Sequence, residues 1–134
     1  LQYLVHRRVE PSFPPDTLVF LHSYPAAQAV LARLDSQHPG IARRFELYYN
    51  GIELANGWEE LTDKKLTRER LLADNRTRRR AGATTVPVDE HFLAALGDGI
   101  PPCAGVAMGL DRLVMLTTGA EYIDDVLSFG WGCA

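Results

Sequence analysis

The chain has 134 residues, of which 46% are apolar and 23% are charged. This is the composition of an ordinary globular protein, and the length suits one domain with a moderate core. The net charge of −3 excludes a surface that binds nucleic acid over its whole area. No apolar stretch is long enough to span a membrane, and the first residues do not show the pattern expected of a signal peptide.

The cysteines, Cys103 and Cys133, are too few for a disulfide framework. Neither belongs to a spaced set of Cys and His residues, so a structural zinc site is not expected. A reducing cytoplasm is the location that this cysteine usage indicates.

The chain opens at Leu1 without an initiator methionine, in a stretch that leads into the proline-rich residues 10–16 and that we expect to be a loop. We therefore expect the sequence to be a fragment of a longer protein. Residues 17–22 predict a short strand. Pro25 favours a helix start, so residues 26–34 are expected to be helical and residues 37–40 a loop.

Two strands, residues 43–49 and 52–61, are expected on either side of Asn50-Gly51, because both residues of this dipeptide tolerate the positive φ of a type I′ hairpin turn. Residues 63–80 predict a helix with Thr62 or Asp63 as its N-cap. The leucines expected to form its buried face are Leu66, Leu71 and Leu72.

Residues 81–87 are expected to be a linker. Residues 88–96 then predict a short helix that ends at the following glycines. Residues 105–109 predict a strand, residues 111–117 a helix, and residues 122–129 a short helical turn before an extended tail. The elements do not alternate regularly as βαβ units, which favours an α+β fold with an antiparallel sheet and helices on one side.

The hairpin is acidic. A two-residue turn makes Glu46 and Glu53 diagonal neighbours on one face, at roughly 7–8 Å. Two such carboxylates favour a divalent cation that bridges phosphate oxygens, and magnesium suits this role. For Asn56 and Glu60 to share that face, the strand needs a bulge between residues 54 and 57, which Gly57 would assist. The alternative is that these glutamates only cover the solvated face of a sheet.

Small and large residues alternate in the strand at 105–109. Its small residues, Gly105, Ala107 and Gly109, would form a face open to a flat ligand, with the large ones in the core. Arg112 follows at a helix start, where it could stack on a base and contact phosphate. The alternative is tight packing, with Asp111 as an N-cap. Together with the acidic hairpin, the strand favours a nucleotide pocket.

The basic run at residues 76–80 consists of Arg76, Arg78, Arg79 and Arg80. It is typical of a solvated helix end, and a contact with the phosphate of RNA or a nucleotide is the alternative.

Residues 105–112, which read GVAMGLDR, resemble motif 3 of class II aminoacyl-tRNA synthetases. Residues 45–63, which read FELYYNGIELANGWEELTD, resemble the lysine-site segment of lysyl-tRNA synthetases. The order and spacing of the two motifs make the resemblance specific. It implies the C-terminal part of a class II catalytic domain, with motifs 1 and 2 lying upstream of this chain.

The resemblance also implies roles for single residues. Glu46 and Glu53 match the ligands of magnesium on the ATP phosphates. Gly105, Gly109 and Arg112 match the ATP side of motif 3, where the arginine stacks on adenine and counts as the catalytic residue. Asn56 matches a contact to the amino-acid substrate, and Glu60 matches the partner of its distal ammonium group.

Alanines at positions 55 and 107 replace glycines of ordinary lysyl-tRNA synthetases. In this respect the chain is similar to the elongation factor P–(R)-β-lysine ligase family, in which Ala107 would reshape the floor of the amino-acid pocket. That family activates (R)-β-lysine with ATP as an adenylate and transfers it to a lysine of elongation factor P.

The resemblance further implies a homodimer of the full-length protein, built by motif 1. Because motif 2 is not recognisable here, we expect the chain alone to be inactive. A lysyl-tRNA synthetase that charges tRNA and a non-catalytic synthetase-like binding module are the alternatives.

Overall fold

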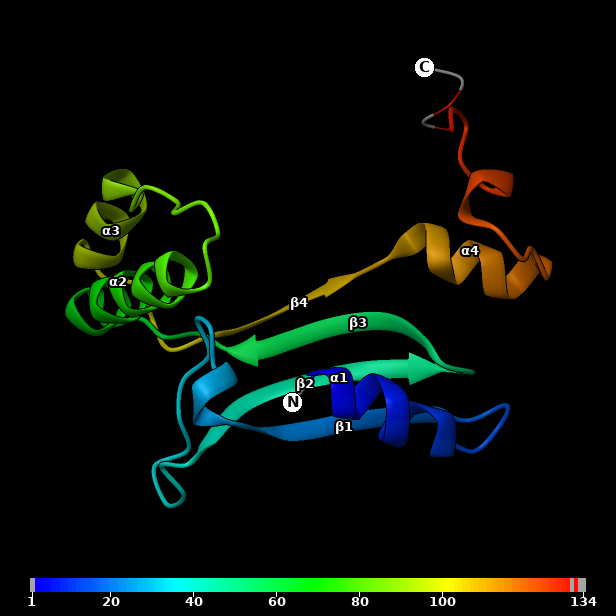
Figure 1. Ribbon diagram of the computed structural model, residues 1–134, viewed down its shortest axis with the longest axis horizontal. Helices are drawn as coiled ribbons and strands as arrows, with labels where there is room; N and C mark the ends of the chain where they lie inside the picture. The colour runs from blue at the N-terminus through cyan, green and yellow to red at the C-terminus, as the bar shows by residue number, and fades with distance from the viewer. Residues whose placement is uncertain (1, 131, 133–134) are drawn as a thin grey trace. The chain divides into compact units, whose positions relative to one another are not determined.

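The computed structural model describes residues 2–130 and residue 132. Its four strands form one antiparallel sheet in the order β1-β2-β3-β4 (Figure 1). The strands are β1 Leu18–Pro25, β2 Ile41–Tyr49, β3 Ile52–Glu59 and β4 Ala104–Met108. The α-helices are α1 Gln2–Leu4, α2 Lys64–Arg80, α3 Glu90–Gly97 and α4 Leu110–Thr118. The predicted α+β class with an antiparallel sheet is confirmed.

Four short helical turns complete the described chain: Val5–Val9, Glu10–Ser12, Ala26–Gln28 and Ile123–Asp125. The first two show that the expected opening loop is largely helical, which corrects that prediction. Among the described helices, none combines the length and the apolar character needed to cross a membrane. Cys103 is a free, exposed thiol, whereas Cys133 lies outside the described residues.

The chain divides into two compact units. The first takes the described parts of residues 1–22, 45–57 and 106–134, and the second takes residues 23–44 and 58–105. Buried apolar residues of the first unit are Tyr48, Leu54, Ala55 and Met115. Those of the second unit are Tyr24, Ala29, Ala32, Ala42, Leu61, Leu93 and Leu96. Each unit therefore has a small core of its own.

The predicted hairpin is confirmed. Asn50 and Gly51 have φ values of 47° and 76°, which are the left-handed values that a type I′ turn requires. In the first unit Asn50 also exchanges hydrogen bonds with Asp16, since Oδ1 accepts from the Asp16 main-chain N–H at 2.7 Å and Nδ2 donates to the Asp16 carboxylate at 3.1 Å. Figure 1 shows β2 and β3 side by side, joined by this turn.

The start of α2 is also as predicted, because the Asp63 side chain accepts from the main-chain N–H of Leu66 at 2.8 Å. The predicted buried face of this helix is only partly right, because Leu71 alone of the three leucines is half-buried. Leu66 and Leu72 are 41% and 42% exposed, whereas Thr67 is fully buried. The Thr67 hydroxyl donates to the main-chain oxygen of Leu61 at 3.3 Å, so the cap and this bond together hold a different side of the helix inward.

Residues 26–34 do not form the expected helix. β1 continues to Pro25, one short turn follows, and then Ala32 and Leu34 form isolated antiparallel bridges with Glu60 and Ala42. Val30 has a φ of 51°, which a helix excludes. Pairing with neighbouring extended chain satisfies the main-chain groups here, so tertiary contacts override the helical propensity of the alanines.

Residues 105–108 lie in strand β4 as expected and Gly109 follows its end, but the predicted burial is wrong. Val106, Met108 and Leu110 are 63%, 49% and 68% exposed, so the large residues do not point into a core. The period of two determines which side chains share a face, and it leaves open which face is covered. In addition, α4 begins at Leu110 with Gly109 as its N-cap, so Asp111 is not the cap.

An ion-pair cluster in the second unit joins β2, β3 and the segment before β2. Glu59 pairs with Arg43 at 2.6 Å and with Arg33 at 2.8 Å. The hydrogen bond from Arg43, reinforced by the charges of Arg43 and Arg33, lowers the pKa of the Glu59 carboxyl.

This pKa shift predicts acid sensitivity. Because the folded pKa lies below the unfolded value of about 4.3, the contribution of Glu59 to stability is complete above that pH. It is lost as the pH falls through the lower folded pKa. Urea unfolding at pH 6 and pH 3 should therefore show a smaller acid loss for Glu59→Gln than for the unmodified chain. Glu69→Gln, at an exposed position of α2, is the control and should keep the full acid loss; equal losses in all three would contradict the assignment.

Candidate functional site

An amide lies between two carboxylates on the β2–β3 hairpin. Nδ2 of Asn56 donates to Oε1 of Glu46 at 3.2 Å and to Oε1 of Glu53 at 3.5 Å. The Tyr48 hydroxyl donates to the other Glu46 oxygen at 2.6 Å. Glu46 is only 7% exposed, so these neutral donors compensate the cost of burying its carboxylate.

These contacts confirm the predicted change of side-chain direction in β3. Glu53 and Asn56 are three residues apart, so in a regular strand they would point to opposite faces. The shared hydrogen bonds put both on one face, and the consecutive residues Leu54 and Ala55 are each 4% exposed. A one-residue bulge between Glu53 and Asn56 accounts for both observations.

Motif 3 meets the hairpin in the first unit. Nη1 of Arg112 donates to the main-chain oxygen of Glu53 at 2.6 Å and lies 3.9 Å from Oε2 of the same residue. The Gly109 main-chain N–H donates to the Leu54 oxygen at 2.9 Å. A Cβ atom at position 109 would lie 3.3 Å from Cδ of Arg112, so the glycine makes room for the arginine stem.

The second unit positions Glu60. Nε1 of Trp58 donates to Oε2 of Glu60 at 2.8 Å, and the Glu60 main-chain N–H donates to the Cys103 oxygen at 2.9 Å. A Cβ atom at position 105 would lie 3.1 Å from Oε1 of Glu60. The face of Gly105 that was expected to admit a flat ligand therefore borders this carboxylate.

The predicted residues thus form two groups. Glu46, Glu53, Asn56, Gly109 and Arg112 come together in the first unit, and Glu60 lies beside Gly105 in the second. Ala107 is exposed in β4. Sequence reasoning missed Trp58, although it shares its parity with Asn56 and Glu60 and carries an N–H donor.

The donor atoms of Glu46 and Glu53 are of the kind that a hard cation binds. Glu46 and Glu53 offer carboxylate oxygens on either side of one amide, and Mg²⁺ is commonly held by one or two carboxylates together with phosphates and water. Within the described part of the chain, no cluster of three or more His, Cys, Asp or Glu side chains could hold a metal ion. A cation here would therefore need further ligands from phosphate or water.

The hairpin and motif 3 resemble those of class II aminoacyl-tRNA synthetases. Comparison with models of known protein families leads to the same class. The chain belongs to the family of class II tRNA synthetases (D, K and N), whose model matches residues 11–131.

The chain is also similar to individual curated proteins within this family. The chain is 49% identical over 129 residues to the elongation factor P–(R)-β-lysine ligase of Proteus mirabilis. It is 47% identical to the protein of the same name from Pectobacterium atrosepticum and 46% identical to that from Salmonella gallinarum. Each match covers 96% of this chain and 40% of the relative. The chain therefore spans well under half the length of these relatives, and the resemblance seen in its motifs is confirmed.

Proposed function

We propose that the full-length protein uses ATP to activate a lysine-like amino acid, (R)-β-lysine, and transfers it to a lysine side chain of elongation factor P in the cytoplasm. The names of the relatives support the substrate and the acceptor. The single observation that carries the proposal is the Asn56 amide between Glu46 and Glu53, with Arg112 bound to Glu53. This arrangement combines carboxylates suited to a metal ion with a cation suited to phosphate.

In the first step an oxygen of the amino-acid carboxylate attacks the α-phosphorus of ATP. A C–O–P linkage forms, and the bond to the departing pyrophosphate breaks. Because charge moves among phosphate oxygens and no covalent enzyme intermediate is needed, positioning and charge stabilisation provide the catalysis. A bound Mg²⁺ would neutralise phosphate charge, with Glu46 and Glu53 as its protein ligands.

The chain's own residues have distinct parts in this proposal. Arg112 supplies a fixed positive charge and a planar surface for the adenine, and Gly109 leaves space for its stem. Asn56 orients both carboxylates and contacts the amino acid. In the second step the acceptor lysine amine attacks the carbonyl carbon of the adenylate, which releases AMP and forms an amide bond.

Glu60 is proposed to pair with the distal ammonium of the amino acid. The Trp58 N–H on Oε2 fixes the carboxylate plane and leaves Oε1 as the freer acceptor. Ala107 is proposed to shape the pocket floor. A methyl group discriminates between such substrates by about 1–3 kcal/mol, so it can favour an amino group on the β carbon over one on the α carbon.

The test uses the full-length protein, expected to act as a homodimer, in ATP–pyrophosphate exchange with (R)-β-lysine or α-lysine. Transfer is then followed by the mass gain of elongation factor P. We expect exchange to prefer (R)-β-lysine and the mass of one β-lysyl group to appear on the acceptor. Charging of tRNA with α-lysine would overturn the proposal in favour of a lysyl-tRNA synthetase, and ligand binding without exchange would favour a non-catalytic module.

Gly105→Ala tests the role of the space beside Glu60. The added Cβ would lie 3.1 Å from Oε1, so the carboxylate must shift by a few tenths of an ångström. In the full-length protein we expect KM for the amino acid to rise about 10-fold while KM for ATP stays within about twofold. Gly40→Ala is the matched control, because no atom lies within 4 Å of the added Cβ there. An unchanged amino-acid KM would separate Gly105 from substrate binding.

A further inference from the structure

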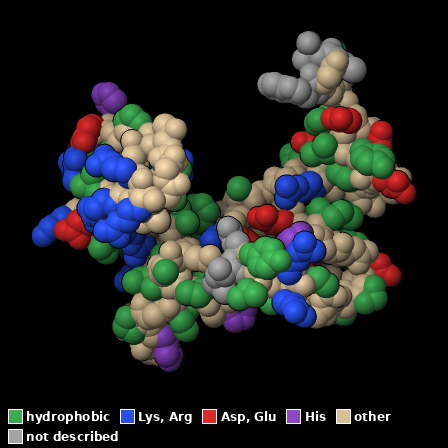
Figure 2. Space-filling view, in the orientation of Figure 1, with side chains coloured by type: hydrophobic (Ala, Val, Ile, Leu, Met, Phe, Trp, Pro, Cys, Tyr) green, Lys and Arg blue, Asp and Glu red, His purple; other side chains and the backbone are tan. Residues whose placement is uncertain are grey.

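Helix α2 carries a strong local positive charge. Its 17 residues include eight lysines and arginines but only two acidic residues, Glu69 and Asp74. The whole chain has 14 lysines and arginines and a net charge of −3, so more than half of its cations lie on one helix. Figure 2 shows blue Lys and Arg side chains gathered over the region of α2. Such a concentration produces a field that attracts anionic partners.

Several of these cations have partners within the second unit. Arg68 forms an ion pair with Glu90, Arg70 donates to the main-chain oxygen of Ala32, and Nε of Arg78 donates to that of Thr84 at 3.0 Å. Among the described residues, the side chains of Arg76 and Arg79 form neither a hydrogen bond nor an ion pair, and the same holds for Lys64, Lys65 and Arg80. Structural contacts therefore account for only part of the charge on α2, and of the remaining cations Arg76 and Arg79 line a groove.

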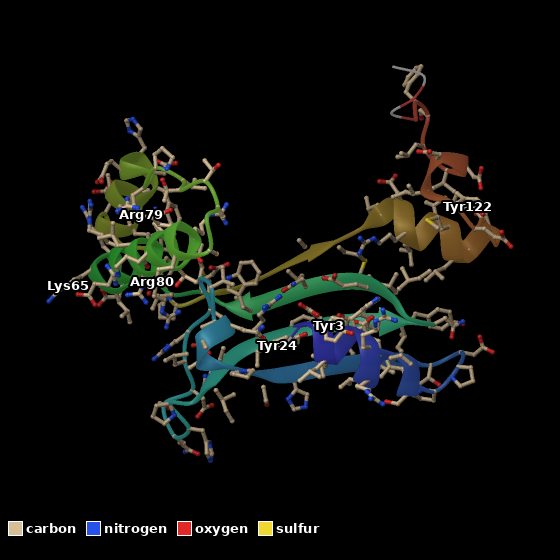
Figure 3. The ribbon with its side chains drawn as sticks, in the orientation of Figure 1. Tyr3, Tyr24, Lys65, Arg79, Arg80 and Tyr122 are labelled. Atoms are coloured by element: carbon tan, nitrogen blue, oxygen red, sulfur yellow. The ribbon has the colours of Figure 1, made fainter. Side chains whose placement is uncertain are left out.

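Arg76 and Arg79 border a groove of about 430 Å³ between the C-terminal half of α2 and the segment that follows it. Its other lining residues are Leu72, Asn75, Thr85, Val86, Pro87 and Val88. The lining therefore combines apolar side chains with two arginines. Figure 3 labels Arg79 and Arg80, which belong to the C-terminal end of α2. It also labels Lys65, which belongs to the first turn of the same helix.

The groove is preformed by hydrogen bonds between its two walls. Nδ2 of Asn75 donates to the Val86 main-chain oxygen at 2.6 Å, and Oδ1 accepts from the Val86 N–H at 2.9 Å. This paired contact holds the segment after α2 against the helix. Less conformational entropy is therefore lost when a ligand enters than if the wall had to form on binding.

The apolar part of the groove is exposed. Leu72 is 42% exposed and Val86 is 55% exposed, although the spacing of Leu72 on α2 had predicted burial. An exposed apolar surface beside charged side chains is typical of an interaction site. We infer that the groove binds an acidic segment of a protein partner, whose carboxylates pair with Arg76 and Arg79 and whose apolar side chain contacts Leu72 and Val86.

The lining favours protein over RNA. A phosphate backbone offers no apolar group to Leu72 and Val86, and no aromatic residue on which an unpaired base could stack lines this groove. Carboxylates and one apolar side chain match both parts of the lining. This identification of the partner rests on the proposed function. The candidate partner is the protein that accepts the β-lysyl group.

The test measures the Kd of the full-length protein for elongation factor P without ATP, by titration calorimetry. Arg79→Glu should weaken binding at least 10-fold, and Arg76→Gln should weaken it to a smaller extent. Lys65→Glu, with the same change of charge on the same helix outside the groove, should change Kd less than twofold. ATP–pyrophosphate exchange and the far-ultraviolet circular dichroism should be unchanged in all three variants.

Equal weakening by Arg79→Glu and Lys65→Glu would overturn the groove as a specific site, because only the general field of α2 would then matter. Weaker binding of unfractionated tRNA by Arg79→Glu, with unchanged binding of elongation factor P, would overturn the choice of a protein partner. These binding measurements need no adenylate. A protein that fails to activate any lysine would therefore refute the proposed function, while the contrast in Kd would still decide the groove.

Discussion

Glu53→Gln in the full-length protein is expected to lower the rate of ATP–pyrophosphate exchange by at least about 100-fold, the usual effect of removing one preorganised electrostatic group. Glutamine preserves the shape and an acceptor for the Asn56 amide, which donates to Oε1 of Glu53 at 3.5 Å. The main-chain oxygen that accepts from Arg112 also remains. The variant therefore removes one negative charge and little else.

Magnesium dependence identifies what that charge does. If Glu53 is a metal ligand, the Mg²⁺ concentration for half-maximal exchange should rise in Glu53→Gln, and excess Mg²⁺ should restore part of the rate. Glu69→Gln makes the same chemical change at an exposed position of α2 and should leave both quantities unaltered. A large loss of rate without any change in Mg²⁺ dependence would contradict the role of metal ligand.

Glu60→Gln is expected to raise KM for the lysine-like substrate at least about 30-fold. Removing one partner of a hydrogen-bonded charge pair costs roughly 2–5 kcal/mol. Trp58 donates to Oε2 at 2.8 Å, so the glutamine carbonyl oxygen should turn toward the indole. The amide NH₂ then replaces Oε1 and presents donors to a substrate ammonium group that also only donates.

The neighbouring residue provides the control. Glu59 is the residue before Glu60, and its carboxylate is paired with Arg33 and Arg43. Glu59→Gln should therefore keep an ordinary amino-acid KM, and KM for ATP should change little in either variant. A selective rise of KM for ATP in Glu60→Gln would show that this carboxylate acts on the nucleotide and not on the amino acid.

Local chemistry explains the parts of the site that could be predicted from sequence. The Asn50-Gly51 turn needs only the positive φ of its own residues, 47° and 76°. The Asp63 cap likewise forms within one helical turn. The predicted bulge followed from requiring Glu53 and Asn56 to share a face, and that condition is met by their hydrogen bond.

Tertiary contacts decided the rest. Periodicity does not reveal which face of an element is covered, so the prediction failed for Leu72 and for Val106, which are 42% and 63% exposed. Local propensity favoured a helix at residues 26–34, but pairing of Ala32 with Glu60 is a contact between residues far apart in the chain. The sequence by itself determined the motifs and the acidic hairpin, because these depend on nearby residues. Only the tertiary structure brought Arg112 to Glu53 and left the groove on α2 open, because those features depend on how separate segments pack.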